Sequence, residues 1–192
     1  MSLTIKKEDA VLVAIDFQVK LMANMHGKEK VEDTVCRLVK GLRLFEIPII
    51  VTQQYTKGIG STTSAITEAL TEKLSDTVFE TSLKPIEKTT FSAMKEPAFA
   101  KALVETGKRT VILTGMESHI CVLQTAMDLI ETGFKVFGVV DCMASRTTEN
   151  KELAQVRMTQ AGVTITSYEA VLFELAECSH DPNSKQIAAI VK

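Results

Sequence analysis

The fold is decided by one stretch of the sequence, Thr110-Val111-Ile112-Leu113-Thr114-Gly115-Met116-Glu117-Ser118-His119-Ile120-Cys121. It opens with a short apolar, β-branched run, which is typical of a strand buried on both faces of a parallel sheet. Directly after it, apolar side chains recur at helical spacing over residues 122–130, and Gly133 stands where a C′ glycine would end that helix. The stretch therefore predicts a strand that leads straight into a helix.

The same alternation of strand and helix runs through the rest of the chain. Other strand-like apolar runs occupy residues 11–15, 47–52, 135–140 and 163–166, and helical patterns occupy residues 31–45, 153–161, 170–177 and 184–191. Repeated β-α-β order with right-handed crossovers predicts an α/β protein, a three-layer α/β/α sandwich around a doubly wound parallel sheet. The length of 192 residues fits a single domain, 1–192.

Residues 53–92 have a different character. They are polar, contain Gly58, Gly60 and Pro85, and carry the pattern of a short helix only over residues 64–74. We interpret this stretch as excursions above the sheet that shape a pocket.

Composition excludes several classes of protein. The net charge of −2 and the pI near 6.0 argue against nucleic-acid binding, which needs basic side chains to neutralise phosphates. No apolar run reaches the length that spans a bilayer, and the first residues lack the apolar core of a secretory signal, so we expect no membrane association. The four cysteines form no C-x-x-C pair, which favours a reduced, cytoplasmic protein without disulfides.

Two reactive residues follow strands of the expected sheet. In doubly wound folds, ligands bind at the carboxyl ends of the strands, where the strand order reverses. Asp16 ends the strand at residues 11–15, and Cys121 begins the helix after the strand at residues 110–114. If these two strands are the pair at the switch point, Asp16 and Cys121 face the same crevice.

These residue types suit nucleophilic catalysis. The free N–H groups at a helix N-terminus favour a thiolate, so we expect a lowered pKa for Cys121. Asp16 could take the thiol proton and later give it to a leaving group. A cation is wanted to offset the two negative charges, and the polar stretch offers Lys88. Taken singly, each residue more commonly has a structural role: Asp in a turn, Cys as a small buried side chain, Lys in solvent.

Three segments in this order resemble signature segments of the isochorismatase-like cysteine hydrolases. They are Ala14-Ile15-Asp16-Phe17-Gln18, Glu87-Lys88-Thr89-Thr90-Phe91-Ser92, and Gly115-Met116-Glu117-Ser118-His119-Ile120-Cys121-Val122-Leu123-Gln124-Thr125-Ala126. The resemblance extends from about residue 10 to residue 171 and is greatest with the metal-free, isochorismatase domain-containing branch. It implies a Rossmann-like, six-stranded parallel sheet with helices on both faces.

The resemblance also implies roles for individual residues. Asp16, Lys88 and Cys121 match the catalytic triad of the family. A cis peptide bond is implied between Met116 and Glu117, and the backbone N–H groups of Glu117 and Cys121 match its oxyanion hole. The implied reaction is hydrolysis of a C–N bond in a small amide or carbamoyl compound through a covalent Cys121 intermediate. A homo-oligomer is implied as well.

The chain departs from two branches of the superfamily. Nicotinamidases carry an Asp-x-His metal site after the second strand, whereas this chain reads Thr52-Gln53-Gln54-Tyr55-Thr56. We therefore expect no metal and no other cofactor. Isochorismatases proper cleave a vinyl ether and lack the cysteine, so Cys121 argues against that reaction.

Further residues have less definite roles. Candidate pocket residues are Phe17, Gln53, Tyr55, Phe91 and His119, although the two phenylalanines could equally belong to the core and His119 could simply pack. The thiol of Cys142 fits either a buried small side chain or a resolving thiol. The alternative to a hydrolase is a catalytically silent or redox-active binding protein on the same fold.

Overall fold

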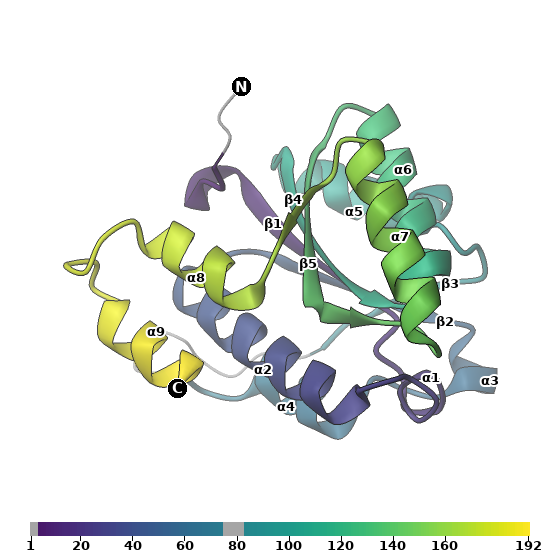
Figure 1. Cartoon of the computed structure of the whole chain (residues 1–192), viewed down its shortest axis with the longest axis horizontal. Coiled ribbons are helices and arrows are strands. Elements are labelled where there is room, and N and C mark those ends of the chain that lie inside the picture. The colour runs from purple at the N-terminus through teal and green to yellow at the C-terminus, as the bar shows by residue number, and fades with distance from the viewer. Residues whose placement is uncertain (1–3, 75–82) are drawn as a thin grey trace.

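The computed structural model describes residues 4–74 and 83–192 of the chain (Figure 1). Its centre is a six-stranded sheet with the order β3-β2-β1-β4-β5-β6, in which all neighbouring strands are parallel. The strands are β1 (Ala10–Ile15), β2 (Ile49–Gln54), β3 (Ile86–Lys88), β4 (Thr110–Met116), β5 (Lys135–Ala144) and β6 (Thr164–Thr166). The expected doubly wound sheet is confirmed, and β1 and β4 are the pair at which the strand order reverses.

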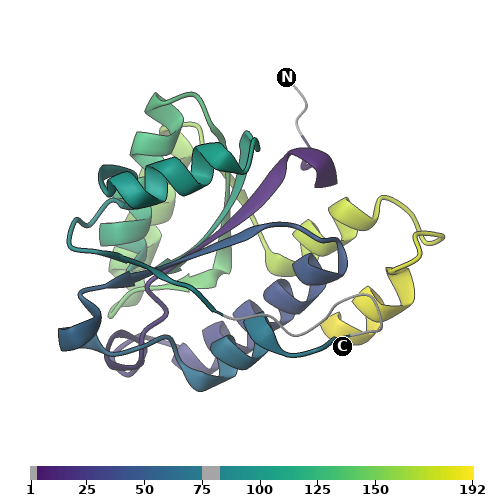
Figure 2. The same ribbon diagram turned by 180° about the vertical axis from the view of Figure 1, so that it is seen from behind.

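Helices cover both faces of the sheet (Figures 1 and 2). One face carries α2 (Lys28–Leu44), α4 (Ser64–Thr71), α8 (Tyr168–Ala176) and α9 (Ser184–Val191), and the other carries α5 (Pro97–Glu105), α6 (Leu123–Glu131) and α7 (Thr148–Gln160). Two short helices, α1 (Val19–Met22) and α3 (Thr56–Ile59), follow the carboxyl ends of β1 and β2. Short turns of helix are η1 (Lys7–Asp9), η2 (Ala93–Lys95) and η3 (Ser118–Val122).

The structure differs from the sequence expectation mainly between residues 53 and 105. Strand β3 lies inside the polar stretch and pairs with β2, so this stretch is partly sheet and not only an excursion above it. The expected helix at residues 64–74 ends at Thr71. Helix α5 had no counterpart in the sequence expectation. It begins with Pro97 in its first turn, and the Glu96 side chain accepts a hydrogen bond from the Ala98 N–H. Residues 75–82 lie outside the described part of the chain.

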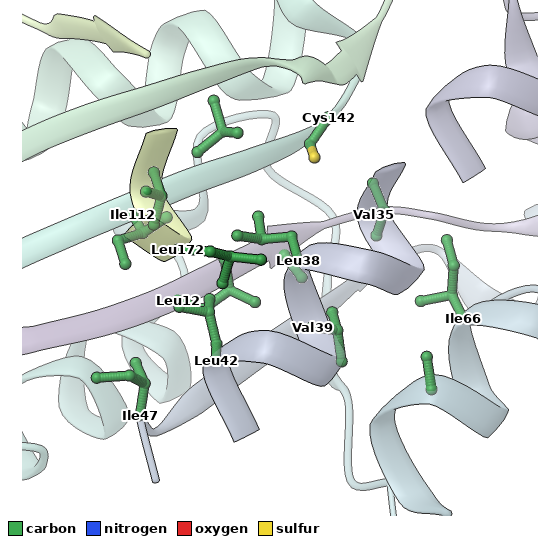
Figure 3. Close-up of a cluster of buried hydrophobic side chains, with 14 of the residues drawn as sticks. Leu12, Val35, Leu38, Val39, Leu42, Ile47, Ile66, Ile112, Cys142 and Leu172 are labelled. Carbon is green, nitrogen blue, oxygen red and sulfur yellow. The ribbon is translucent and has the colours of Figure 1, made fainter. Parts of the chain in front are cut away.

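Successive side chains of the buried strands point to opposite faces of the sheet, and this divides the core into two clusters. In β1, Leu12 belongs to the cluster on the α2 face, and its neighbour Val13 belongs to the cluster on the α6 face. Figure 3 shows the α2-face cluster, in which Leu38 and Leu42 of α2 pack near Leu12. Because continuous apolar strands supply both clusters, each layer of helices is held to the sheet by burial of apolar surface.

Truncating Leu38 tests this packing. The side chain is fully buried (0% exposed), so Leu38→Ala should lower the free energy of unfolding by about 2–5 kcal/mol, through lost burial and the cavity left behind. Leu153→Ala is the matched control: this leucine is 62% exposed on α7, and the change should stay within about 0.5 kcal/mol of the wild type. Urea unfolding followed by circular dichroism measures both. Equal losses would contradict the core assignment.

Candidate active site

The backbones of β1 and β4 approach each other closely where both strands end. Gly115 pairs with Ile15 and has a φ of +143°, and a Cβ at Gly115 would lie 2.5 Å from the carbonyl oxygen of Ile15. Only glycine fits this contact without displacing β1. The residue directly after β1, Asp16, adopts a left-handed φ of 54°, which Asp tolerates better than most residues. This junction turns Asp16 out of the strand at the switch point.

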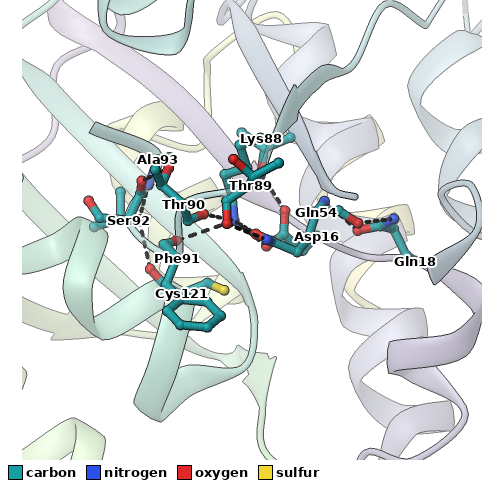
Figure 4. Close-up of polar contacts among 12 residues, drawn as sticks. Asp16, Gln18, Gln54, Lys88, Thr89, Thr90, Phe91, Ser92, Ala93 and Cys121 are labelled. Carbon is teal, nitrogen blue, oxygen red and sulfur yellow. Dashed lines mark hydrogen bonds and ion pairs between the residues drawn. The ribbon is translucent and has the colours of Figure 1, made fainter. Parts of the chain in front are cut away.

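Asp16 forms a buried ion pair with Lys88 (Figure 4). Lys88 Nζ lies 2.7 Å from Asp16 Oδ2, and both side chains have 0% exposure. The hydroxyl of Thr52 donates to Asp16 Oδ1 at 2.7 Å, so both carboxylate oxygens have a partner. Lys88 Nζ also donates to Gln54 Oε1 at 2.6 Å and to the carbonyl oxygens of Thr90 and Phe91, each at 3.2 Å. The structure thus brings together two of the three expected triad residues in direct contact.

Cys121 completes the cluster from the other side of the junction. It lies in η3, a π-helical turn between β4 and α6, and only 6% of it is exposed. The Thr125 hydroxyl donates to the Cys121 carbonyl at 2.7 Å and accepts a bond from the Ala93 N–H at 2.9 Å. Because Ala93 follows the Lys88 segment, these bonds connect the turn that carries Cys121 to the segment that carries Lys88.

The pKa of the Cys121 thiol is raised to about 12, against the lowering that its place before a helix predicts. Burial is the largest cause, and the Asp16 carboxylate adds to it through its charge and through a hydrogen bond with the thiol. The Lys88 ammonium acts in the opposite direction. At neutral pH the resting group is therefore a thiol with a carboxylate beside it, and that carboxylate is placed to accept the proton when the thiol attacks a substrate.

Gln54 and Gln18 form an amide pair that supports the ion pair. Gln18 Oε1 accepts from the Gln54 N–H at 2.6 Å, and Gln18 Nε2 donates to the Gln54 carbonyl at 3.0 Å. The Gln54 side chain is thereby fixed between Lys88 and the carbonyl of Thr89, to which its Nε2 donates at 2.9 Å. Sequence reasoning missed Gln18, Thr52 and Gln54. Their signal was their position, at or just beyond the carboxyl ends of β1 and β2.

The other expected pocket residues are dispersed. Phe17 is fully buried in the α2-face cluster, so it packs in the core. Gln53 points away from Lys88: its Nε2 donates to Thr62 Oγ1 at 2.9 Å. His119 Nδ1 lies 2.9 Å from Ser145 Oγ. Tyr55 and Phe91 are about half exposed, at 51% and 55%.

The peptide bond between Met116 and Glu117 is cis. The Glu117 side chain points toward the end of β5, where its Oε2 accepts from Arg146 Nε at 2.9 Å. Next to it, Ser118 Oγ is buried and has no hydrogen-bond partner among the described residues. Among these same residues, no group of three or more His, Cys, Asp or Glu side chains converges as a metal site.

An isochorismatase domain matches residues 10–170. The chain belongs to the isochorismatase family. It is 40% identical over 157 residues to the zebrafish isochorismatase domain-containing protein 1, a match that covers 81% of this chain and 51% of that relative, or about half its length.

Solved structures share the fold. The structure of the MAR1 ribonuclease from Caenorhabditis elegans has a TM-score of 0.86 and 35% identity, covering 98% of this chain and 92% of that one. The fold is also that of the YcaC protein from Escherichia coli, described as an octameric hydrolase of unknown specificity. Its TM-score is 0.88 at 24% identity, covering 99% of this chain and 90% of that one.

None of the helices in the described ranges, 4–74 and 83–192, is both long and apolar enough to cross a membrane.

Replacing Asp16 tests its effect on the acidity of the Cys121 thiol. Asp16→Asn removes the negative charge that helps to raise the pKa of Cys121, so iodoacetamide should alkylate Cys121 faster at pH 8. We expect an acceleration of about three- to tenfold for each unit by which the pKa falls. Peptide mass measures the rate, with the exposed Cys178 as internal reference. An unchanged rate at Cys121 would show that Asp16 does not act on the thiol, and a slower rate would show that Asp16 acts on it as a proton acceptor and not by raising its pKa.

Replacing Gln54 tests the support of the ion pair. Gln54→Met keeps the length of the side chain but removes an acceptor from the buried ammonium, so the free energy of unfolding should fall by about 1.5–3 kcal/mol. Gln160→Met, at an exposed position at the end of α7, is the control. Chemical denaturation compares the two variants. Losses within about 0.5 kcal/mol of each other would remove Gln54 from the support.

Proposed function

We propose that this protein is a cysteine hydrolase that cleaves a C–N bond of a small amide or carbamoyl compound, with Cys121 as nucleophile. The observation that carries the proposal is the placement of the Cys121 thiol against a buried Asp16–Lys88 pair. A carboxylate that contacts a thiol can act as its general base, and an adjacent ammonium limits the build-up of negative charge. Family membership supports hydrolysis as the reaction class.

In the proposed mechanism Asp16 transfers two protons, one in each half of the reaction. The proton of the Cys121 thiol moves to Asp16 as sulfur attacks the carbonyl carbon, and the N–H groups of Glu117 and Cys121 stabilise the resulting oxyanion. When the intermediate collapses, the C–N bond breaks and Asp16 protonates the leaving amine. Asp16 then takes a proton from water, which attacks the thioester, and returns it to the departing sulfur of Cys121.

The raised pKa of Cys121 fits this scheme better than one with a preformed thiolate. A thiol with a pKa near 12 is almost entirely protonated at neutral pH, so it reacts slowly with chance electrophiles. Proton transfer to Asp16 has to accompany attack on a correctly placed substrate. Lys88, whose ammonium contacts Asp16, offsets the negative charge that the carboxylate and the attacking sulfur share.

The structure gives less support to a redox-active protein. Cys142 is fully buried in the core cluster on the α2 face, whereas Cys121 belongs to the cluster on the α6 face. A resolving thiol has to reach the oxidised one, and here the sheet separates the two. The ribonuclease activity named for the C. elegans structure is not extended to this chain, because its net charge of −2 offers no excess of phosphate-binding groups.

Two properties beyond the reaction form part of the proposal. The chain assembles as a homo-oligomer, an expectation supported by the octamer of the YcaC relative. It works in a reducing compartment such as the cytoplasm, since all four cysteines are free thiols in the structure.

Replacing the nucleophile tests the proposal. Ammonia and amine release is measured over a panel of small primary amides and N-carbamoyl compounds. For any compound that is turned over, Cys121→Ala should reduce the rate at least about a thousandfold, since the nucleophile cannot be replaced by its neighbours. Cys178→Ala, at an exposed cysteine, should leave the rate unchanged. Full turnover by Cys121→Ala would refute the mechanism, and a wild-type protein inert towards the whole panel would favour the silent binding protein.

A further inference from the structure

Exposed apolar side chains lie on the three segments that carry residues of the candidate site. Val19, Tyr55 and Phe91 are 44%, 51% and 55% exposed. Each lies close in sequence to a residue of the candidate site: Val19 follows Asp16, Tyr55 follows Gln54, and Phe91 follows Lys88. Single exposed apolar residues are common on protein surfaces, but three on separate segments that each carry a site residue point to a ligand.

The backbone holds Val19 and Tyr55 in their exposed positions. The Val19 N–H donates to the carbonyl of Ser61 at 3.0 Å, and its Cγ2 would lie 2.6 Å from a Cβ at Gly60. Tyr55 donates its N–H to the carbonyl of Lys88 at 3.0 Å and has a left-handed φ of 38°. Its ring covers Gly58, where a Cβ would collide with it. These contacts restrict both side chains, and the bond from Tyr55 to the Lys88 carbonyl ties Tyr55 to the segment of the ion pair.

Phe91 is held next to the nucleophile in the same way. Its carbonyl accepts from Lys88 Nζ at 3.2 Å, and the next residue, Ser92, donates to Asp128 of α6 at 2.6 Å. Figure 4 shows Phe91 and Cys121 on the same side of the Asp16–Lys88 pair. Because the backbone is already ordered, only the side-chain torsions of Phe91 remain to be restricted when a ligand packs on its ring.

The charges around the thiol are already paired. Asp16 and Lys88 neutralise each other at 2.7 Å, and Glu117 is paired with Arg146 at 2.9 Å. A charged substrate would lose its hydration at this site without gaining a free partner among these groups. A neutral substrate avoids that cost.

We propose that the substrate is an uncharged amide or carbamoyl compound with an aromatic or bulky apolar group, which packs against Phe91 and Tyr55 while its carbonyl carbon meets Cys121. This inference rests on the proposed function, because it takes Cys121 as the reacting atom. The apolar group gains burial, and an aromatic one gains a ring contact in addition. Phe91 and Tyr55 thereby select the substrate, and Cys121 with the Asp16–Lys88 pair cleaves its C–N bond.

Covalent probes with one reactive head test the inference without turnover. The protein is treated with iodoacetamide, its N-phenyl derivative and iodoacetate at pH 9, and alkylation of Cys121 and Cys178 is followed by peptide mass. Each rate is divided by that of the exposed Cys178 in the same sample. We expect the N-phenyl probe to favour Cys121 at least about tenfold over iodoacetamide, since it adds a ring contact and buried area. Iodoacetate should be the slowest of the three.

Variants locate the effect. Phe91→Ala should reduce the preference for the N-phenyl probe about three- to tenfold, and Phe91→Leu should restore part of it, because an apolar side chain returns. Phe173→Ala is the matched control: this phenylalanine is 47% exposed on α8, in a different part of the structure, and its loss should leave the preference unchanged.

The outcomes separate this inference from the proposed function. If Cys121 reacts but shows the same probe ratios as Cys178, the substrate class is overturned and the nucleophile stands. A second copy of the chain that covers Phe91 and Tyr55 would give this result. The same conclusion follows if Phe173→Ala lowers the preference as much as Phe91→Ala. If none of the probes alkylates Cys121, the inference fails, whereas the proposed function is decided separately by the turnover of the Cys121→Ala variant on the amide panel.

Discussion

The site depends on one buried ion pair, Asp16 with Lys88. Neither group can be buried alone, because an unpaired charge inside a protein loses its hydration without compensation. Each therefore requires the other, and both require further partners for their remaining hydrogen-bonding groups. Thr52 supplies one to the carboxylate, and Gln54 supplies one to the ammonium. The hydrogen-bonding groups of the ion pair need partners. The polar residues at the ends of β1 and β2 and the turn after β3 supply them.

The sheet topology brings these partners together from distant parts of the sequence. Asp16 and Lys88 are separated by 72 positions, yet β3, β2 and β1 are neighbours in the sheet and end at the same edge. The reversal of strand order then places β4 on the other side of β1. The close backbone contact at Gly115 draws the two strands together, so that the turn carrying Cys121 faces the carboxylate. The doubly wound sheet is thus what turns three scattered residues into one cluster.

The sequence predicts those elements whose structure depends on local patterns, and it does not predict those that depend on contacts between distant segments. Strands β1 and β4 and the helix after β4 were predictable because continuous apolar runs and helical spacing are local patterns. Strand β3 was not, since its three residues carry no pattern of their own and are defined by pairing with β2. For the site, the resemblance selected Asp16, Lys88 and Cys121, but it did not supply Gln18 or Gln54, whose roles arise from hydrogen bonds between distant segments.

The direction of the Cys121 pKa shift shows where local reasoning ends. A position before a helix favours the thiolate, and that argument considers only the peptide groups of the turn. In the folded protein the thiol is buried against a carboxylate, and both effects favour the protonated form. A buried thiol beside a base is a stable resting state, whereas a buried thiolate beside a carboxylate would repel it. The same arrangement that keeps Cys121 unreactive at rest provides the acceptor for its proton once a carbonyl carbon is in place, so low resting reactivity and catalytic competence have one physical cause.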